Sequence, residues 1–87
     1  MVPDEVLTLL EELSQHCDAP PWTALVEGRD VESGSSFIMT GEGHSRGEDI
    51  YITRDSGPAS AAYLDLIAAL RTYLPELIAE VREGRHS

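Results

Sequence analysis

The spacing of the apolar residues changes twice along the chain, and this change limits the folds open to it. Apolar residues in 3–17 recur every three or four positions, which predicts an amphipathic helix. Those in 22–55 alternate with polar residues, which indicates strands. From residue 58 onward the helical spacing returns. The stripe that we expect the first helix to bury consists of Val6, Leu9, Leu10, Leu13 and Cys17.

The middle of the chain contains three alternating runs, 22–27, 36–40 and 49–53, which are rich in β-branched and aromatic residues. The connectors Gly28–Gly34 and Gly41–Gly47 hold glycine together with Ser, Asp or Glu. Glycine-rich connectors of this kind are typical of hairpin loops. The sequence therefore predicts a three-stranded antiparallel meander.

The C-terminal segment begins at Pro58 or Ser60 and has an apolar face that covers close to half of a helix. This face consists of Tyr63, Leu64, Ile67, Leu70, Leu74, Leu77, Ile78 and Val81. Pro75 lies in its middle, where proline removes a backbone hydrogen bond and clashes with the preceding turn. It therefore either kinks one helix or begins a second helix with Thr72 as its cap. The resulting prediction is a single small α+β domain spanning 1–87, in the order α-β-β-β-α, with both helices on one face of the sheet.

The charge is strongly negative, because 16 Asp and Glu oppose six Arg and no Lys to give a net charge of −10. Such a surface repels phosphate backbones, so direct nucleic-acid binding is not expected. It attracts a basic protein partner, and the association rate then falls as salt rises. A high negative charge also keeps a small protein soluble without any partner.

Composition limits the cellular location as well. The single cysteine, Cys17, excludes an intramolecular disulfide. No stretch approaches the roughly 18–20 apolar residues of a membrane span, and the N-terminus lacks a signal-peptide pattern. We therefore expect a cytoplasmic protein without a membrane partner.

The residues with catalytic or metal-binding chemistry form no recognised constellation. The histidines are His16, His44 and His86, and only His44 has several carboxylates nearby in sequence, without metal-ligand spacing. Cys17 is expected to be a packed thiol rather than a nucleophile. The run 33–36 lacks the Lys of a phosphate loop and the flanking pattern of a nucleophile elbow. We expect neither enzymatic activity nor a bound metal or cofactor.

The connectors also concentrate charge, since Arg29, Arg46 and Arg54 lie among seven acids between residues 27 and 55. In one interpretation each Arg pairs with a neighbouring carboxylate and only supports its turn. In the other, the loops at the ends of the strands form a recognition surface, because binding residues are common on loops of a rigid scaffold. The sequence leaves both interpretations open.

Three runs in this region resemble a group of small, mostly uncharacterised bacterial proteins, some of them associated with toxin–immunity loci. The runs are Trp22–Asp30 (W-x5-GRD), Ser33–Gly41 (SGSSFIMTG) and Arg46–Ile50 (RGEDI). The C-terminal segment, with Leu74-Pro75 followed by 78–81, is similar to tails of actinobacterial and phage reading frames. The segment 59–62 lacks the acids expected of relatives. The resemblance implies no catalytic residue.

Size, acidity and this resemblance together predict a non-catalytic immunity protein or antitoxin that neutralises a basic toxin domain by direct binding. One alternative is a phage-type or accessory structural protein that acts as a homodimer through its C-terminal helix. Another is a DNA mimic that inhibits a nucleic-acid enzyme. The residues predicted to contact the partner are Glu11, Glu12, Asp18, Trp22, Glu27, Arg29, Asp30, Glu32 and Tyr51.

Overall fold

The computed structural model describes residues 1–86 and begins with the predicted helix, α1, at Asp4–Gln15. Pro3 stands before its first turn in an extended conformation, and Asp4 and Glu5 lie at the positive end of the helix dipole. The predicted buried stripe is partly wrong. Leu7 is the buried residue of α1, whereas Leu9 and Leu13 are about half exposed. Cys17 lies beyond the helix and is exposed, not packed.

Two strands, β1 (Trp22–Leu25) and β2 (Phe37–Thr40), pair antiparallel with Ala24 opposite Ile38. The predicted α+β class is confirmed, but the three-stranded meander is wrong. The third run meets β2 at one bridge only, where Ile38 and Ile50 exchange two hydrogen bonds of 2.9 Å. After that bridge the chain leaves β2 and forms a separate hairpin.

The separate hairpin consists of β3 (Thr53–Arg54) and β4 (Gly57–Pro58). Its formation explains why the third run does not continue along β2. The carbonyl of Ile52 accepts the N–H of Ala59 at 2.8 Å, so this backbone is already paired with the chain that follows the hairpin. On the other side of the bridge, Thr40 uses its side-chain hydroxyl to bond the carbonyl of Glu48 at 2.9 Å. A 3₁₀ turn, η1 (Gly43–Ser45), closes the intervening loop.

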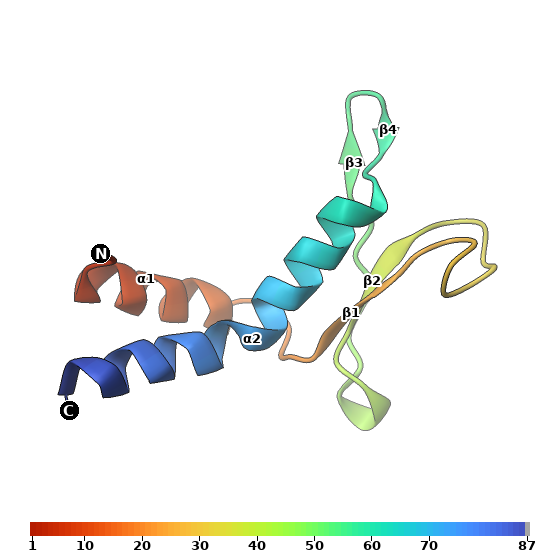
Figure 1. Cartoon of the computed structure of the whole chain (residues 1–87). Helices are drawn as coiled ribbons and strands as arrows, with labels where there is room; N and C mark the ends of the chain where they lie inside the picture. Colours follow the sequence, from red (N-terminus) through yellow and green to blue (C-terminus); the bar gives the residue numbers. More distant parts are fainter. Residues whose placement is uncertain (87) are drawn as a thin grey trace.

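The last element, α2, is one continuous helix over Ala61–His86 with Pro75 inside it. Its axis changes direction midway along its length, in the region of Pro75 (Figure 1). The structure therefore selects the first of the two predicted alternatives, a kinked helix rather than two helices. The cause is the missing N–H of proline and the clash of its ring with the preceding turn.

We predicted that both helices cover one face of the sheet, and this prediction is wrong. The first half of α2 packs on β1 and β2, whereas α1 packs only against α2 and lies alongside its C-terminal half (Figure 1). Arg82 pairs with Glu11, and Arg85 pairs with Asp4, across this helix pair. The cause of the difference is the length of α2, which extends well beyond the two short strands and offers α1 a surface of its own.

The core lies between β2 and the first half of α2. Its buried members are Ile38, Ala59, Leu64 and Ala68. Around them pack the partly buried side chains Trp22, Ala24, Ile50, Ile52 and Ile67. In addition, Thr72 of α2 bonds the backbone of Trp22 twice, accepting its N–H at 2.9 Å and donating to its carbonyl at 3.0 Å. This pair of bonds occupies the edge of β1 that faces the helix.

The molecule is extended, measuring 48 × 33 × 21 Å along its principal axes. Its radius of gyration is 15.1 Å, against about 12 Å for a compact chain of this length. Within residues 1–86, neither helix has the length and apolar character needed to cross a membrane.

Candidate functional site

The loop that follows β1 is held by an unusual concentration of hydrogen bonds. The carbonyl of Val26 accepts the N–H groups of Arg29, Asp30 and Val31 at 3.0, 2.8 and 3.4 Å. In return, Oδ2 of Asp30 accepts the N–H of Val26 at 2.8 Å. Gly28 has φ +83°, a conformation in which glycine carries no steric penalty. The first part of the predicted Gly28–Gly34 loop is therefore a locally fixed element rather than a loose connector.

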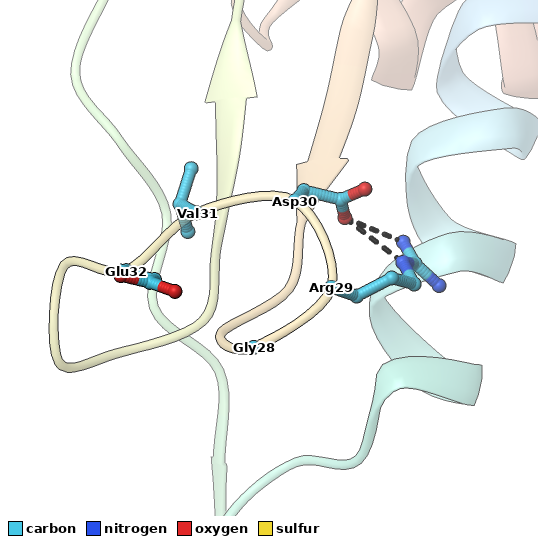
Figure 2. Close-up of a pocket in the computed structure, with 5 residues that line it drawn as sticks. All are labelled: Gly28, Arg29, Asp30, Val31 and Glu32. Carbon is cyan, nitrogen blue, oxygen red and sulfur yellow. Dashed lines mark hydrogen bonds and ion pairs between the residues drawn. The ribbon is translucent and has the colours of Figure 1, made fainter.

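Arg29 connects this loop to α2. Its Nη1 and Nη2 donate to Oδ2 and Oδ1 of Asp65, both at 2.9 Å, and its Nε donates to Asp30 at 2.9 Å. Figure 2 shows Arg29 and Asp30 joined on the side of the loop nearest the helix, with Glu32 on the other side. A bidentate guanidinium–carboxylate pair fixes orientation as well as distance. The loop is therefore oriented relative to α2 by one side chain.

The same network shifts the ionisation of its members. The hydrogen bonds from Arg29 hold the pKa of both Asp30 and Asp65 below the usual range. For Asp30 the N–H of Val26 adds to this effect. The two carboxylates in turn raise the pKa of Arg29. All three groups are solvent-exposed, so the network determines loop geometry more than it stabilises the fold.

We predict that Arg29→Gln changes the two carboxyl titrations unequally. Asp65 loses the hydrogen bonds that depress its pKa, so its pKa should rise into the ordinary range of an aspartate, whereas Asp30 keeps the N–H of Val26 and its pKa should stay partly depressed. Both carboxyl pKa values are lower in the native protein than in the unfolded chain. The stability that the pairing contributes is therefore fully present above the unfolded-state pKa, and it is lost as the pH falls through the native pKa values. Carboxyl NMR titration between pH 6 and 2 measures this, and an unchanged Asp65 midpoint in the variant would contradict it.

A hollow of about 390 Å³ lies where the first connector meets the segment before the β3–β4 hairpin, and it is lined by Glu27, Tyr51, Pro58 and residues 34–36 and 52–53. The Glu27 carboxylate in this hollow is held in one orientation, because its Oε2 accepts the N–H groups of Ser33 and Gly34 at 2.8 and 2.9 Å. Tyr51 packs its ring against Phe37, with 5.6 Å between centroids, and is itself exposed. An oriented carboxylate beside an exposed aromatic ring suits the side chain of Lys or Arg. We call this hollow the Glu27–Tyr51 groove.

The predicted contact residues fall into three places. Five of them belong to the strand-end loops, and these are Glu27, Arg29, Asp30, Glu32 and Tyr51. Glu11 and Glu12 lie on α1, at the far end of the molecule, and Glu11 is paired with Arg82. Asp18 and Trp22 lie near the middle of α2. The structure therefore does not bring all nine residues into one surface.

Trp22 has a structural role in this arrangement. Its ring packs against the core, and its indole N–H donates to the carbonyl of Asp18 at 3.0 Å. The Arg71 guanidinium lies 5.9 Å from the ring centroid and also donates to the Asp18 carbonyl at 3.2 Å. Tyr51 is therefore the more accessible of the two aromatic residues predicted to anchor a partner.

Every arginine side chain has a partner inside the molecule. Arg29 and Arg46 bond Asp65, Asp30 and Asp49, and Arg54 bonds the hydroxyl of Tyr63 and covers its ring. Arg71, Arg82 and Arg85 bond groups near or on α1. Within residues 1–86, the carboxylates outside any ion pair are Glu5, Glu12, Asp18, Glu27, Glu32, Glu42, Glu48, Asp55, Glu76, Glu80 and Glu83. The surplus negative charge is therefore exposed and uncompensated.

The prediction for the last helix overlooked one surface. Leu66, Leu70, Tyr73, Leu77 and Val81 are exposed and recur every three or four residues on α2. We call these five residues the outer stripe. Leu66 and Tyr73 were absent from the predicted apolar face, although their spacing from Leu70 and Leu77 was readable in the sequence as a heptad pattern.

In residues 1–86 no three His, Cys, Asp or Glu side chains are placed to hold a metal ion. No protein-family model matches the chain, no curated protein matches it significantly in sequence, and no solved structure matches it significantly in fold. The resemblance to small proteins of toxin–immunity loci therefore stays a prediction.

Proposed function

We propose that this chain is a non-catalytic acidic binding protein, of the immunity-protein or antitoxin type, that neutralises a basic partner domain by direct binding. The observation that supports this most is the internal use of all six Arg side chains, which leaves exposed carboxylates on both ends of the molecule without a counter-charge. A surface of one sign accelerates the encounter with a partner of the opposite sign.

Within this proposal the Glu27–Tyr51 groove receives a Lys or Arg side chain of the partner. Glu27 is already oriented by two backbone N–H groups, so its carboxylate needs no reorganisation when a cation arrives. Tyr51 supplies apolar area that becomes desolvated in the complex, as interface anchors do. Glu32, on the same connector between β1 and β2, adds to the field that attracts the cation.

The experiment has two stages. The tagged protein is first used to capture its partner from its own host at low and at high salt, followed by identification by mass spectrometry. Recovery of one basic domain that is released by salt supports the proposal. Recovery of nothing but the protein itself would instead favour the homodimeric structural protein.

The second stage measures association of the captured domain with three variants, Glu12→Gln, Glu32→Gln and Glu27→Gln. Each removes one exposed charge, so each should slow association by roughly twofold at low salt and reduce its salt dependence. Arg46→Gln is the matched control, because it removes a cation that is paired with Asp49 and leaves the molecule more negative. Unchanged association rates in all three acid variants would exclude this mechanism.

A further inference from the structure

The outer stripe is a second apolar face on a helix that already buries one. Leu64, Ala68 and Ile78 are the buried residues of α2 and point towards the sheet and α1. On the outer stripe, Leu66, Leu70, Tyr73, Leu77 and Val81 are 58%, 50%, 57%, 49% and 40% exposed. Apolar side chains that recur every three or four residues form the kind of seam that another helix covers.

The accessible surface area of the molecule is also larger than that of a compact monomer, as expected if a partner covers such a face. The accessible surface is 6244 Å². A compact monomeric protein of 9.5 kDa has roughly 5,000 Å², so the excess is roughly 1,200 Å². Each side of a standard protein–protein interface contributes about 800 Å². The excess is therefore large enough for one such interface, and a contiguous apolar face of this kind is typical of interaction sites.

The charges beside the outer stripe decide which partner fits it. Glu76 and Glu80 lie three and seven residues after Tyr73, so they form the adjacent row of the helix, which Glu83 continues. None of these three acids has an ion-pair partner within residues 1–86. The arginines of the same helix are engaged elsewhere: Arg71 with Trp22 and Asp18, Arg82 and Arg85 with α1.

A second copy of the chain is a poor occupant for this reason. Its own stripe would bring the same row of acids and no free arginine of α2, and like charges across an interface are unfavourable. A helix with Lys or Arg beside its apolar residues has the opposite charge and the same spacing. Charge complementarity therefore selects a basic amphipathic helix.

We infer that the outer stripe is the docking surface for a basic amphipathic helix of the partner protein, with partner Lys or Arg side chains opposite Glu76, Glu80 and Glu83. This inference rests on the proposed function, since it gives the same basic partner a second contact surface. The bend near Pro75 separates two straight portions of the stripe, and the partner helix spans one or both of them.

The test uses the full chain and a synthetic helical peptide of about three heptads, with Leu at the two apolar positions of each heptad and Lys at the flanking positions. A second peptide carries Glu in place of Lys. The protein should bind the Lys peptide at least about tenfold more tightly than the Glu peptide, and added salt should weaken only the former. Fluorescence anisotropy of labelled peptide measures both affinities.

Variants locate the binding surface. The double variant Leu66→Ser/Leu70→Ser should weaken binding of the Lys peptide by about tenfold or more. Leu13→Ser is the matched control, because it makes the same substitution at a 55% exposed leucine of α1 and should leave binding unchanged. Circular dichroism checks that both variants fold.

Other results would overturn the inference. Loss of binding in Glu27→Gln, with no effect of the double variant, would assign the peptide to the Glu27–Tyr51 groove and leave the proposed function intact. A homodimer in sedimentation that dissociates in Leu70→Ser would assign the stripe to a second copy. Equal affinity for both peptides, or no binding of either, would also refute it, whereas failure to capture a basic domain from the host refutes the proposed function itself.

Discussion

Replacement of Ile38 by alanine should lower the free energy of unfolding by about 2–5 kcal/mol. Ile38 is fully buried, is paired on one side with Ala24 and on the other with Ile50, and belongs to the cluster of Leu64 and Ala68. Removing its side chain therefore leaves a cavity where the sheet meets α2. The total free energy of unfolding of a chain of 87 residues is roughly 4–13 kcal/mol, so the variant loses a large part of its stability.

Urea unfolding followed by circular dichroism measures this loss. Ile38→Val, which removes one methyl group, should cost only about 0.5–1.5 kcal/mol. Leu66→Ala, on the exposed outer stripe, should change stability by less than about 0.5 kcal/mol in the isolated protein. If Leu66→Ala were as costly as Ile38→Ala, the outer stripe would be buried already and the assignment of the core would be wrong.

The helices were predictable because their spacing is local information. The helix dipole favours Asp4 and Glu5 in the first turn of α1, and Pro75 bends α2 wherever that helix packs. The buried face of α1 was not predictable in the same way. The helix carries two overlapping apolar rows, and its packing against α2, where Arg82 and Arg85 also pair with its acids, buries Leu7 and leaves Leu9 exposed.

The sheet was predictable in its first pair of strands and not in its third. Alternation of apolar residues around Ile50 and Ile52 is the same whether the segment pairs over its whole length or at one residue. The outcome depends on competing hydrogen bonds, from Ala59 to Ile52 and from the Thr40 hydroxyl to Glu48. The apolar periodicity of the sequence carries no information about which segments these bonds join.

In the candidate site, too, the local features were predictable from the sequence and the tertiary contacts were not. The loop at Gly28–Gly34 was predictable from its Gly, Asp and Ser residues, and the structure adds the hydrogen bonds that fix its first part. That Glu27 and Tyr51 line one groove is a consequence of the tertiary fold, since they belong to different connectors. The outer stripe was not recognised because the sequence interpretation divided its members. Leu70, Leu77 and Val81 were assigned to the broad apolar face of the last helix, and Leu66 and Tyr73 were left out of it.

Thr72→Val should destabilise the protein by about 1–3 kcal/mol. Valine has nearly the same shape and helix propensity as threonine but neither donates nor accepts a hydrogen bond. The N–H and the carbonyl of Trp22 would both lose their partner, at 2.9 and 3.0 Å in the native protein, in a region that is partly buried. Unpaired backbone groups in such a place cost more than the bonds themselves contributed.

Thr72→Ser keeps the hydroxyl and serves as the control, so it should retain most of the stability that Thr72→Val loses. Hydrogen exchange distinguishes the mechanism from a packing effect, because the Trp22 amide should exchange faster in the valine variant and stay protected in the serine variant. Equal unfolding free energies for the two variants would contradict the role assigned to the hydroxyl.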